Sequence, residues 1–256
     1  MPESVPSAVV HEASGVARFL RARLSWGARY GLGLTLAVVA TFGALAAFVE
    51  LQDTYSDAGG IADVDRATME LARSIVSDDL TPLVVGLTDS GSTVAFVVLV
   101  VTVAILLLVF RRRWEALQLV LASGLGGFVV LGLKTVFARP RPAEQVIQAT
   151  GFSFPSGHAF ASTVFYGTVL TIVWQITDKP LWRALAAVLC PLMILAIGLS
   201  RVYLNVHYVT DVLAGFASGF VWLTAVYLVV DGVEHRRKRA GQAETNRAQH
   251  TVDESE

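Results

Sequence analysis

Six apolar segments constrain the fold of this chain more than any other feature. A helix that crosses the hydrocarbon core of a bilayer, about 30 Å thick, takes roughly 20 apolar residues. The segments of that length, or nearly that length, are Tyr30–Val49, Thr93–Phe110, Ala116–Leu133, Ala159–Ile176, Ala184–Leu199 and Val212–Val230. A content of 54% hydrophobic and 16% charged residues is not that of a soluble domain. The sequence therefore predicts an all-α membrane protein, a bundle of six transmembrane helices.

The polar segments at the two ends define the limits of the membrane domain. Residues 1–29 are expected to form a cytoplasmic tail, either disordered or as a short helix on the membrane surface. Residues 30–230 form the predicted six-helix domain. The first span is longer than the apolar region of a signal peptide, so we expect it to be retained as an anchor. Residues 231–256 become polar without periodicity, which predicts a disordered cytoplasmic tail.

Residues 51–92 are the one sizeable insertion between predicted spans. Apolar residues recur three and four positions apart over residues 63–76, which predicts an amphipathic helix. Asp63 and Asp65 would lie at the positive end of its dipole. Thr81-Pro82 predicts the start of a second short helix. The insertion is expected to be extracytoplasmic, where it would either shape a lipid entrance or simply connect two spans.

Basic residues gather in four places along the chain. They are Arg18, Arg21, Arg23 and Arg29; Arg111–Arg113; Lys179 and Arg183; and Arg236–Arg239. With six spans, all four clusters fall on one side of the membrane, and the positive-inside rule makes that side cytoplasmic. We therefore expect a multi-pass protein of the cell membrane, with both termini inside.

Three groups of polar residues lie in the gaps that face the other side. In chain order they are Lys134-(x6)-Arg141-Pro142, Pro155-Ser156-Gly157-His158 and Ser200-Arg201-(x5)-His207-(x3)-Asp211. Lys134, Arg141 and Arg201 supply three cations, and the two arginines can bind phosphate oxygens in bidentate fashion. The second group precedes a predicted span, where N–H groups and the helix dipole favour an anion. Together the three groups indicate a phosphate site beside the membrane.

His207 and Asp211 are four residues apart at the entry to the sixth span. If the helix starts by residue 207, both lie on one face, and the carboxylate can accept a hydrogen bond from the imidazole. That contact would fix the tautomer and leave the second ring nitrogen available to attack phosphorus. A lone histidine at a helix boundary is usually structural, but His158 and His207 both adjoin cations, which favours chemistry.

This three-part pattern resembles that of the type 2 phosphatidic acid phosphatase superfamily, and the resemblance covers Lys134 to Asp211. It implies a metal-independent enzyme, without a cofactor, that hydrolyses a lipid phosphate or diphosphate. His207 would be the nucleophile that forms a phosphohistidine, Asp211 would orient it, and His158 would protonate the leaving oxygen and later activate water. The phosphate would be bound by Lys134, Arg141, Ser156, Gly157 and Arg201. No acidic cluster suited to magnesium lies near the motifs, which agrees with this reading.

Alternatives for the activity remain open at this point. We expect undecaprenyl diphosphate on the outer leaflet as the substrate, and phosphatidic acid or phosphatidylglycerophosphate are the alternatives. Vanadium haloperoxidases have a similar anion site, but six spans argue against that soluble class. A non-catalytic lipid-phosphate binder or transporter would need the cations, but it would not need two histidines and Asp211.

Membrane lipids and the substrate are the expected partners, and no nucleic acid is expected. Ser123-(x3)-Gly127 and Gly215-(x3)-Gly219 place small residues one helical turn apart, which fits either homo-oligomers or ordinary packing of the bundle. Cys190 lies in an apolar segment and is expected to be a core residue. Arg139 is either a bystander or an added substrate contact.

Overall fold

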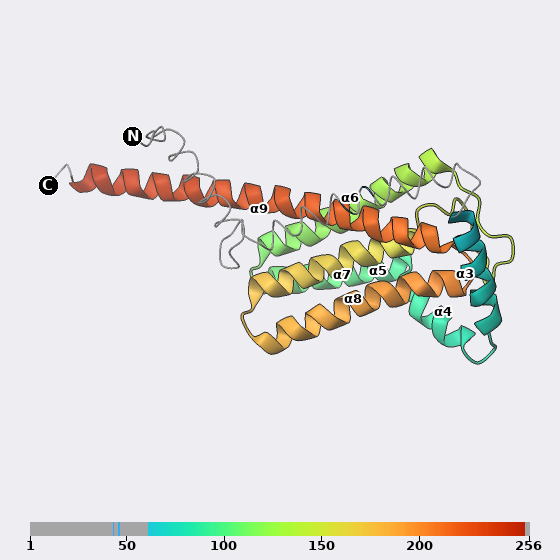
Figure 1. The fold of residues 1–256 in the computed structure, drawn as a ribbon. Helices are drawn as coiled ribbons and strands as arrows, with labels where there is room; N and C mark the ends of the chain where they lie inside the picture. The colour runs from blue at the N-terminus through green and yellow to red at the C-terminus, as the bar shows by residue number, and fades with distance from the viewer. Residues whose placement is uncertain (1–42, 44–45, 47–60, 254–256) are drawn as a thin grey trace, which may run out of the picture.

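The computed structural model describes residues 61–253 together with Gly43 and Ala46, and every regular element within them is a helix (Figure 1). The helices are α3 (Ile61–Ile75), α4 (Thr81–Asp89), α5 (Thr93–Val109), α6 (Arg113–Phe137), α7 (Gly157–Ile176), α8 (Pro180–Tyr203) and α9 (Val209–Asp253). The predicted all-α architecture is therefore confirmed. The first predicted span, Tyr30–Val49, and the predicted N-terminal tail lie outside the described residues.

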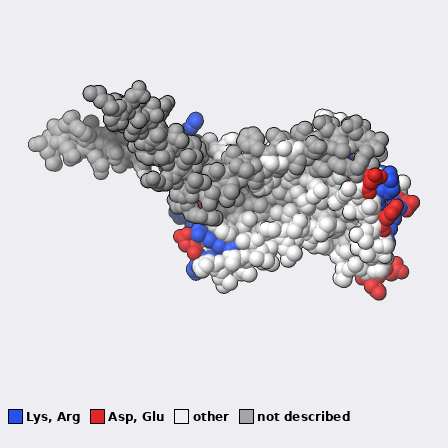
Figure 2. Space-filling view, viewed as in Figure 1, with Lys and Arg blue, Asp and Glu red and all other residues white. Residues whose placement is uncertain are grey.

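The helices α6, α7, α8 and α9 are each long and apolar enough to cross a membrane. The pair α4 and α5, bent by 48° at the junction between them, passes the same test as a fifth span. On the face shown in Figure 2, charged residues gather at two ends of the described part and uncharged side chains cover the region between them. This belt is what a membrane-spanning bundle requires, because the hydrocarbon core strongly disfavours charge.

The two short helices predicted in the insertion are confirmed as α3 and α4. Pro82 occupies the first turn of α4, where its missing N–H costs no helical hydrogen bond. Both helices pack against α8, and α3 also packs against α9, so residues 61–92 of the insertion cover one end of the bundle (Figure 1). This described part of the insertion therefore belongs to the folded body.

The C-terminal tail differs from the expected disorder, because α9 continues as one helix to Asp253. It extends past the other helices at the end of the bundle opposite α3 (Figure 1). Alanine, glutamine and glutamate are frequent after residue 239, and all favour a helix without needing a buried face. The prediction of disorder from the lack of apolar periodicity therefore does not match the structure.

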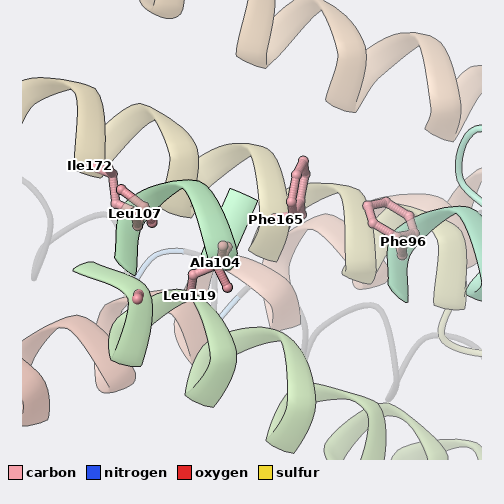
Figure 3. Close-up of a cluster of buried hydrophobic side chains, with 7 residues drawn as sticks. Phe96, Ala104, Leu107, Leu119, Phe165 and Ile172 are labelled. Atoms are coloured by element: carbon pink, nitrogen blue, oxygen red, sulfur yellow. The ribbon is translucent and has the colours of Figure 1, made fainter. Parts of the chain in front are cut away.

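The helix α7 lies at the centre of the bundle and packs against α5, α6, α8 and α9. One buried cluster joins α5, α6 and α7, with the rings of Phe96 and Phe165 in edge-to-face contact at 5.7 Å between centroids (Figure 3). Leu119 on α6 is fully buried in the same cluster. The helix α7, which begins at the second motif, is thus held by the helices that carry residues of the other two motif groups.

The two small-residue pairs have different roles. A Cβ atom on Gly215 would lie 2.6 Å from Ser156 O, and one on Gly219 would lie 2.9 Å from Thr163 Cβ. The pair on α9 therefore allows α9 to approach α7 closely, as ordinary bundle packing requires. A Cβ on Gly127 of α6 would meet nothing within 4 Å, so this glycine borders open space and is not needed for close packing of two helices.

Candidate active site

The site forms where four helix ends meet. Lys134 is in the last turn of α6, His158 in the first turn of α7, Arg201 in the last turn of α8, and Asp211 in the first turn of α9. Because neighbouring helices in the chain run in opposite directions, these ends lie at the same end of the bundle (Figure 1). The charges of Arg201, His207, Arg141 and Lys134 all act on His158. The structure therefore brings the three motif groups together.

The second motif forms the capped start of α7. The Ser156 hydroxyl accepts a hydrogen bond from Ala159 N over 3.5 Å, as an N-cap residue does. Ser156 N donates to Asp211 O over 2.8 Å, so this turn is tied directly to α9. A Cβ on Gly157 would lie 3.7 Å from Lys134 Cε, which places the lysine stem beside the helix start. The N-terminus of α7 therefore lies beside a cation, as an anion site would require.

His207 lies in a turn before α9, which begins only at Val209. The chain reverses after α8 through Asn205, whose φ of 53° is left-handed, a conformation that asparagine tolerates well. His207 N donates to Arg201 O over 3.3 Å, so the backbone of the nucleophile candidate caps the end of α8. The condition that the helix starts by residue 207 is therefore not met, although the expected contact between His207 and Asp211 is present.

The contacts of His207 define its tautomer. Nδ1 lies 3.4 Å from Asp211 Oδ2, and Nε2 lies 3.1 Å from Arg141 Nη1. A guanidinium can only donate, so Nε2 accepts and the ring proton is on Nδ1. Burial lowers the pKa of His207 to about 4, although the hydrogen bond and the charge of Asp211 act in the opposite direction. The ring is therefore neutral at pH 7, with the lone pair of Nε2 on the side of the cations.

Three cations of the motifs have hydrogen bonds to uncharged acceptors. Lys134 donates to the carbonyls of Phe152 and Ser153, and Arg201 donates to Thr88 Oγ1 over 2.8 Å. The third, Arg141, donates to backbone carbonyls, including that of Val206, and to the imidazole of His207. In the part of the chain that the structure describes, no carboxylate lies within ion-pair distance of any of the three. Such cations can neutralise a bound anion.

Arg139 differs sharply from these three. Its guanidinium forms ion pairs with Asp211 Oδ1 at 2.7 Å and with Asp65 Oδ2 at 2.8 Å. It is buried, and its charge is neutralised inside the protein, so the expectation of a bystander or a substrate contact is corrected. Its role is to hold Asp211. Sequence analysis also missed Thr88, which binds Arg201, and no local signal marks Thr88 or Asp65, because their partners are distant in sequence.

The described residues contain no group of three or more histidine, cysteine, aspartate or glutamate side chains that could hold a metal ion.

The region of the chain that carries this site is similar to a known protein family. The family model described as the PAP2 superfamily matches residues 115–234, which include all three motif groups. The matched part of the chain, residues 115–234, is similar to the PAP2 superfamily. The phosphatidic acid phosphatase resemblance expected from the motifs is thereby confirmed.

Proteins that are similar to this chain are named as phosphatases. Phosphatidylglycerophosphatase B of Bacillus subtilis is 27% identical over 184 residues, which cover 71% of this chain and 89% of that protein. Decaprenylphosphoryl-5-phosphoribose phosphatase of Mycobacterium tuberculosis is 34% identical over 139 residues, 51% of this chain and 66% of that protein. A crystal structure of a transmembrane PAP2 type phosphatidylglycerolphosphate phosphatase from Bacillus subtilis has a TM-score of 0.68 and 25% identity, and the alignment covers 77% of this chain and 96% of that one.

Proposed function

We propose that this protein is a lipid phosphatase that works through a phosphohistidine on His207. The observation that carries the proposal is the contact of His207 Nε2 with Arg141, one of three motif cations that have no carboxylate partner among the described residues. A nucleophile and a set of anion-binding groups at the same place are what phosphoryl transfer needs.

The proposed reaction has two steps. His207 Nε2 attacks phosphorus while the bond from phosphorus to the lipid oxygen breaks, and His158 donates a proton to that oxygen. A water molecule then attacks the phosphohistidine, His158 takes the proton of the water, and inorganic phosphate leaves with Nε2 restored. Lys134, Arg141 and Arg201 stabilise the charge on the non-bridging oxygens, together with Ser156 and the Gly157 N–H at the start of α7. No step requires a metal ion.

An apolar groove supports a lipid as the substrate. A cavity of about 500 Å³ lies between α5, α6 and α7, and it extends to Lys134, Gly157 and His158 at the site. Apart from these residues its lining is mostly apolar or glycine, and it includes Phe96 and Gly127. A phosphate bound among the cations would therefore have room beside it for a hydrocarbon chain.

The identity of the lipid is argued from the relatives and the topology. The similar proteins are named for phosphatidylglycerophosphate and for decaprenylphosphoryl-5-phosphoribose, both of them phosphorylated lipids. We propose a phosphorylated membrane lipid of the outer leaflet, with phosphatidylglycerophosphate as the first candidate. Undecaprenyl diphosphate and phosphatidic acid stay predictions, since a terminal phosphate and a long chain are all that the groove and the cations require.

The decisive experiment is a substrate panel with purified protein in detergent. We expect release of inorganic phosphate from at least one of the lipid monophosphates and diphosphates named above, without added metal and in excess chelator. His207→Ala is the control for contaminating activity. Binding of lipid phosphate without release by the wild-type protein would favour a binder or transporter, and activity that chelator removes and magnesium restores would overturn the proposed mechanism.

A further inference from the structure

The insertion carries a buried carboxylate that the reaction above does not use. Asp65, on α3, is 2% exposed, whereas its neighbour Asp63 lies at the surface and accepts a hydrogen bond from Arg66. Asp65 Oδ1 accepts from Thr210 N over 3.1 Å, and Oδ2 accepts from the Thr210 hydroxyl over 2.7 Å. A buried charge is costly unless it is paired and hydrogen-bonded, so α3 is fixed to the start of α9 at this point.

Arg139 links Asp65 to the carboxylate beside the nucleophile. Its Nη2 donates to Asp65 over 2.8 Å, while Nη1 donates to Asp211 over 2.7 Å and to the Thr210 hydroxyl over 2.8 Å. The ring of Tyr208 covers the guanidinium, with its centroid 4.0 Å from the Arg139 Cζ. The arginine is therefore restrained on several sides, which fixes where its Nη1 meets Asp211.

The position of Asp211 depends more on Arg139 than on His207. The ion pair of Asp211 with Arg139 is 2.7 Å long, whereas its contact with His207 Nδ1 is 3.4 Å long. The Asp211 carboxylate also accepts a hydrogen bond at Oδ2 from Tyr208 N over 2.9 Å. Charge-assisted hydrogen bonds near 2.7 Å are the strong ones, so Arg139 sets the orientation in which Asp211 meets the imidazole.

We propose that Asp65 is a positioning residue for the phosphatase reaction, acting on His207 through Arg139 and Asp211. The inference rests on the proposed function, because it assigns a role within that reaction. It also gives the insertion a part in catalysis, although α3 holds none of the motif residues.

The charges explain how Asp65 would act. Asp65, Arg139 and Asp211 together carry one net negative charge, which supports the basicity of His207. Without the carboxylate of Asp65, Arg139 and Asp211 form a pair with no net charge. The Nη2 of Arg139 then loses its acceptor on Asp65, so both Nη1 and Nη2 can donate to Asp211. The other charged or titratable groups that act on His207 are Lys134 of α6, Arg141 of the following loop and His158 of α7, and none of these changes. The imidazole becomes less basic and a weaker nucleophile.

The test compares two isosteric substitutions on the same helix. Asp65→Asn is expected to lower kcat on a soluble aryl phosphate by about 10- to 100-fold, the range typical when a partner that orients a reacting ligand is removed. KM should change little, because the phosphate-binding cations are untouched. The acid limb of the kcat/KM profile should also move to lower pH. Asp63→Asn removes an exposed carboxylate two residues earlier and should leave kcat and the profile unchanged.

A purely structural role would lower the active fraction without moving the acid limb, so an unmoved limb overturns the inference. Equal activity of Asp65→Asn and Asp63→Asn also overturns it, while an active wild type leaves the proposed function standing. No phosphate release by the wild type would overturn both.

A double variant covers the case in which Asp65→Asn does not fold. Asp65→Asn with Arg139→Gln leaves no unpaired buried cation and keeps hydrogen-bonding groups at both positions. We expect kcat to be reduced, because Asp211 is no longer held by Arg139. The acid limb should lie close to that of the wild type, since the net charge of the group is again −1, carried by Asp211 alone. Wild-type kcat in this folded variant would overturn the inference.

Discussion

Arg141 Nη1 lies 3.1 Å from His207 Nε2, so a cation of the proposed phosphate site is in contact with the nitrogen that would attack phosphorus. The other ring nitrogen lies on the side of Asp211. In this arrangement the imidazole is neutral and correctly oriented before any substrate arrives. A phosphate that displaces Arg141 from His207 Nε2 would be bound by the guanidinium and would lie next to the attacking nitrogen at the same time.

The two histidines are expected to differ on substrates with good leaving groups. His207→Ala should abolish both phosphate release and the acid-labile phosphoenzyme, because no nucleophile remains. His158→Ala should still form phosphoenzyme from an activated aryl phosphate, since a good leaving group needs no proton. The measurement is phosphoenzyme trapped by rapid quenching, with His235→Ala, at a position far along α9, as the control. Equal loss in both variants would contradict the assigned roles.

Arg201→Lys should lower kcat/KM although it keeps the charge. We expect a loss of about 10- to 100-fold, the range for losing one hydrogen bond to a charged group. An ammonium cannot keep the bond to Thr88 and also bind phosphate in bidentate fashion. Steady-state kinetics on a soluble phosphate measures the effect. The matched control is Arg183→Lys on the same helix, whose partners include Asp178 at the other end of α8. If the kinetic constants of Arg201→Lys equal those of the wild type, Arg201 does not bind the phosphate in bidentate fashion.

Gly127→Leu should block the groove without disturbing the fold, since a Cβ at this position meets nothing within 4 Å. We expect kcat/KM on a long-chain lipid phosphate to fall by about 5- to 160-fold, which corresponds to the cost of about 1–3 kcal/mol that is typical of overfilling a packed site. Activity on a small aryl phosphate should persist. Gly132→Leu, also on α6 in open space but not in the groove lining, is the control. Parallel losses on both substrates would argue against a chain-binding groove.

The acid limb of kcat/KM is expected well below pH 6.5. His207 must be neutral to attack phosphorus, and burial lowers its pKa to about 4, so activity that depends on it is retained at neutral pH and lost as pH falls toward 4. Asp211→Asn should shift this limb further down, because Asp211 raises the pKa of His207. An activated aryl phosphate, corrected for its own ionisation, provides the profile. A limb at the ordinary histidine pKa that Asp211→Asn leaves in place would assign it to another group.

The side of the membrane on which the site lies can be tested by labelling. In a Cys190→Ala background, Ala143→Cys should react with an impermeant reagent in intact cells, because Ala143 is exposed in the loop after Arg141. Lys179→Cys is exposed between α7 and α8 at the other end and should react only after permeabilisation. The opposite pattern would place the site inside the cell and remove the outer-leaflet substrates from consideration.

The sequence alone determined the apolar helices and the residues that meet at their ends. The second predicted span, Thr93–Phe110, differs from α5 by one residue, because apolar length is a local property that the chain carries without its neighbours. The motif groups were equally readable, since each lies where a span begins or ends. Once the helices alternate in direction, those ends must meet on the same side.

Only the tertiary structure decided how the site is supported. Arg139 and Asp65 are 74 positions apart, and no periodicity indicates that they are paired. The same applies to Gly127 and Gly215, each followed in the sequence by a phenylalanine: Gly127 lines a groove, whereas Gly215 allows α9 to contact α7. Such roles depend on which helix faces pack together, and that is determined by the packing of the whole bundle, which no single segment specifies.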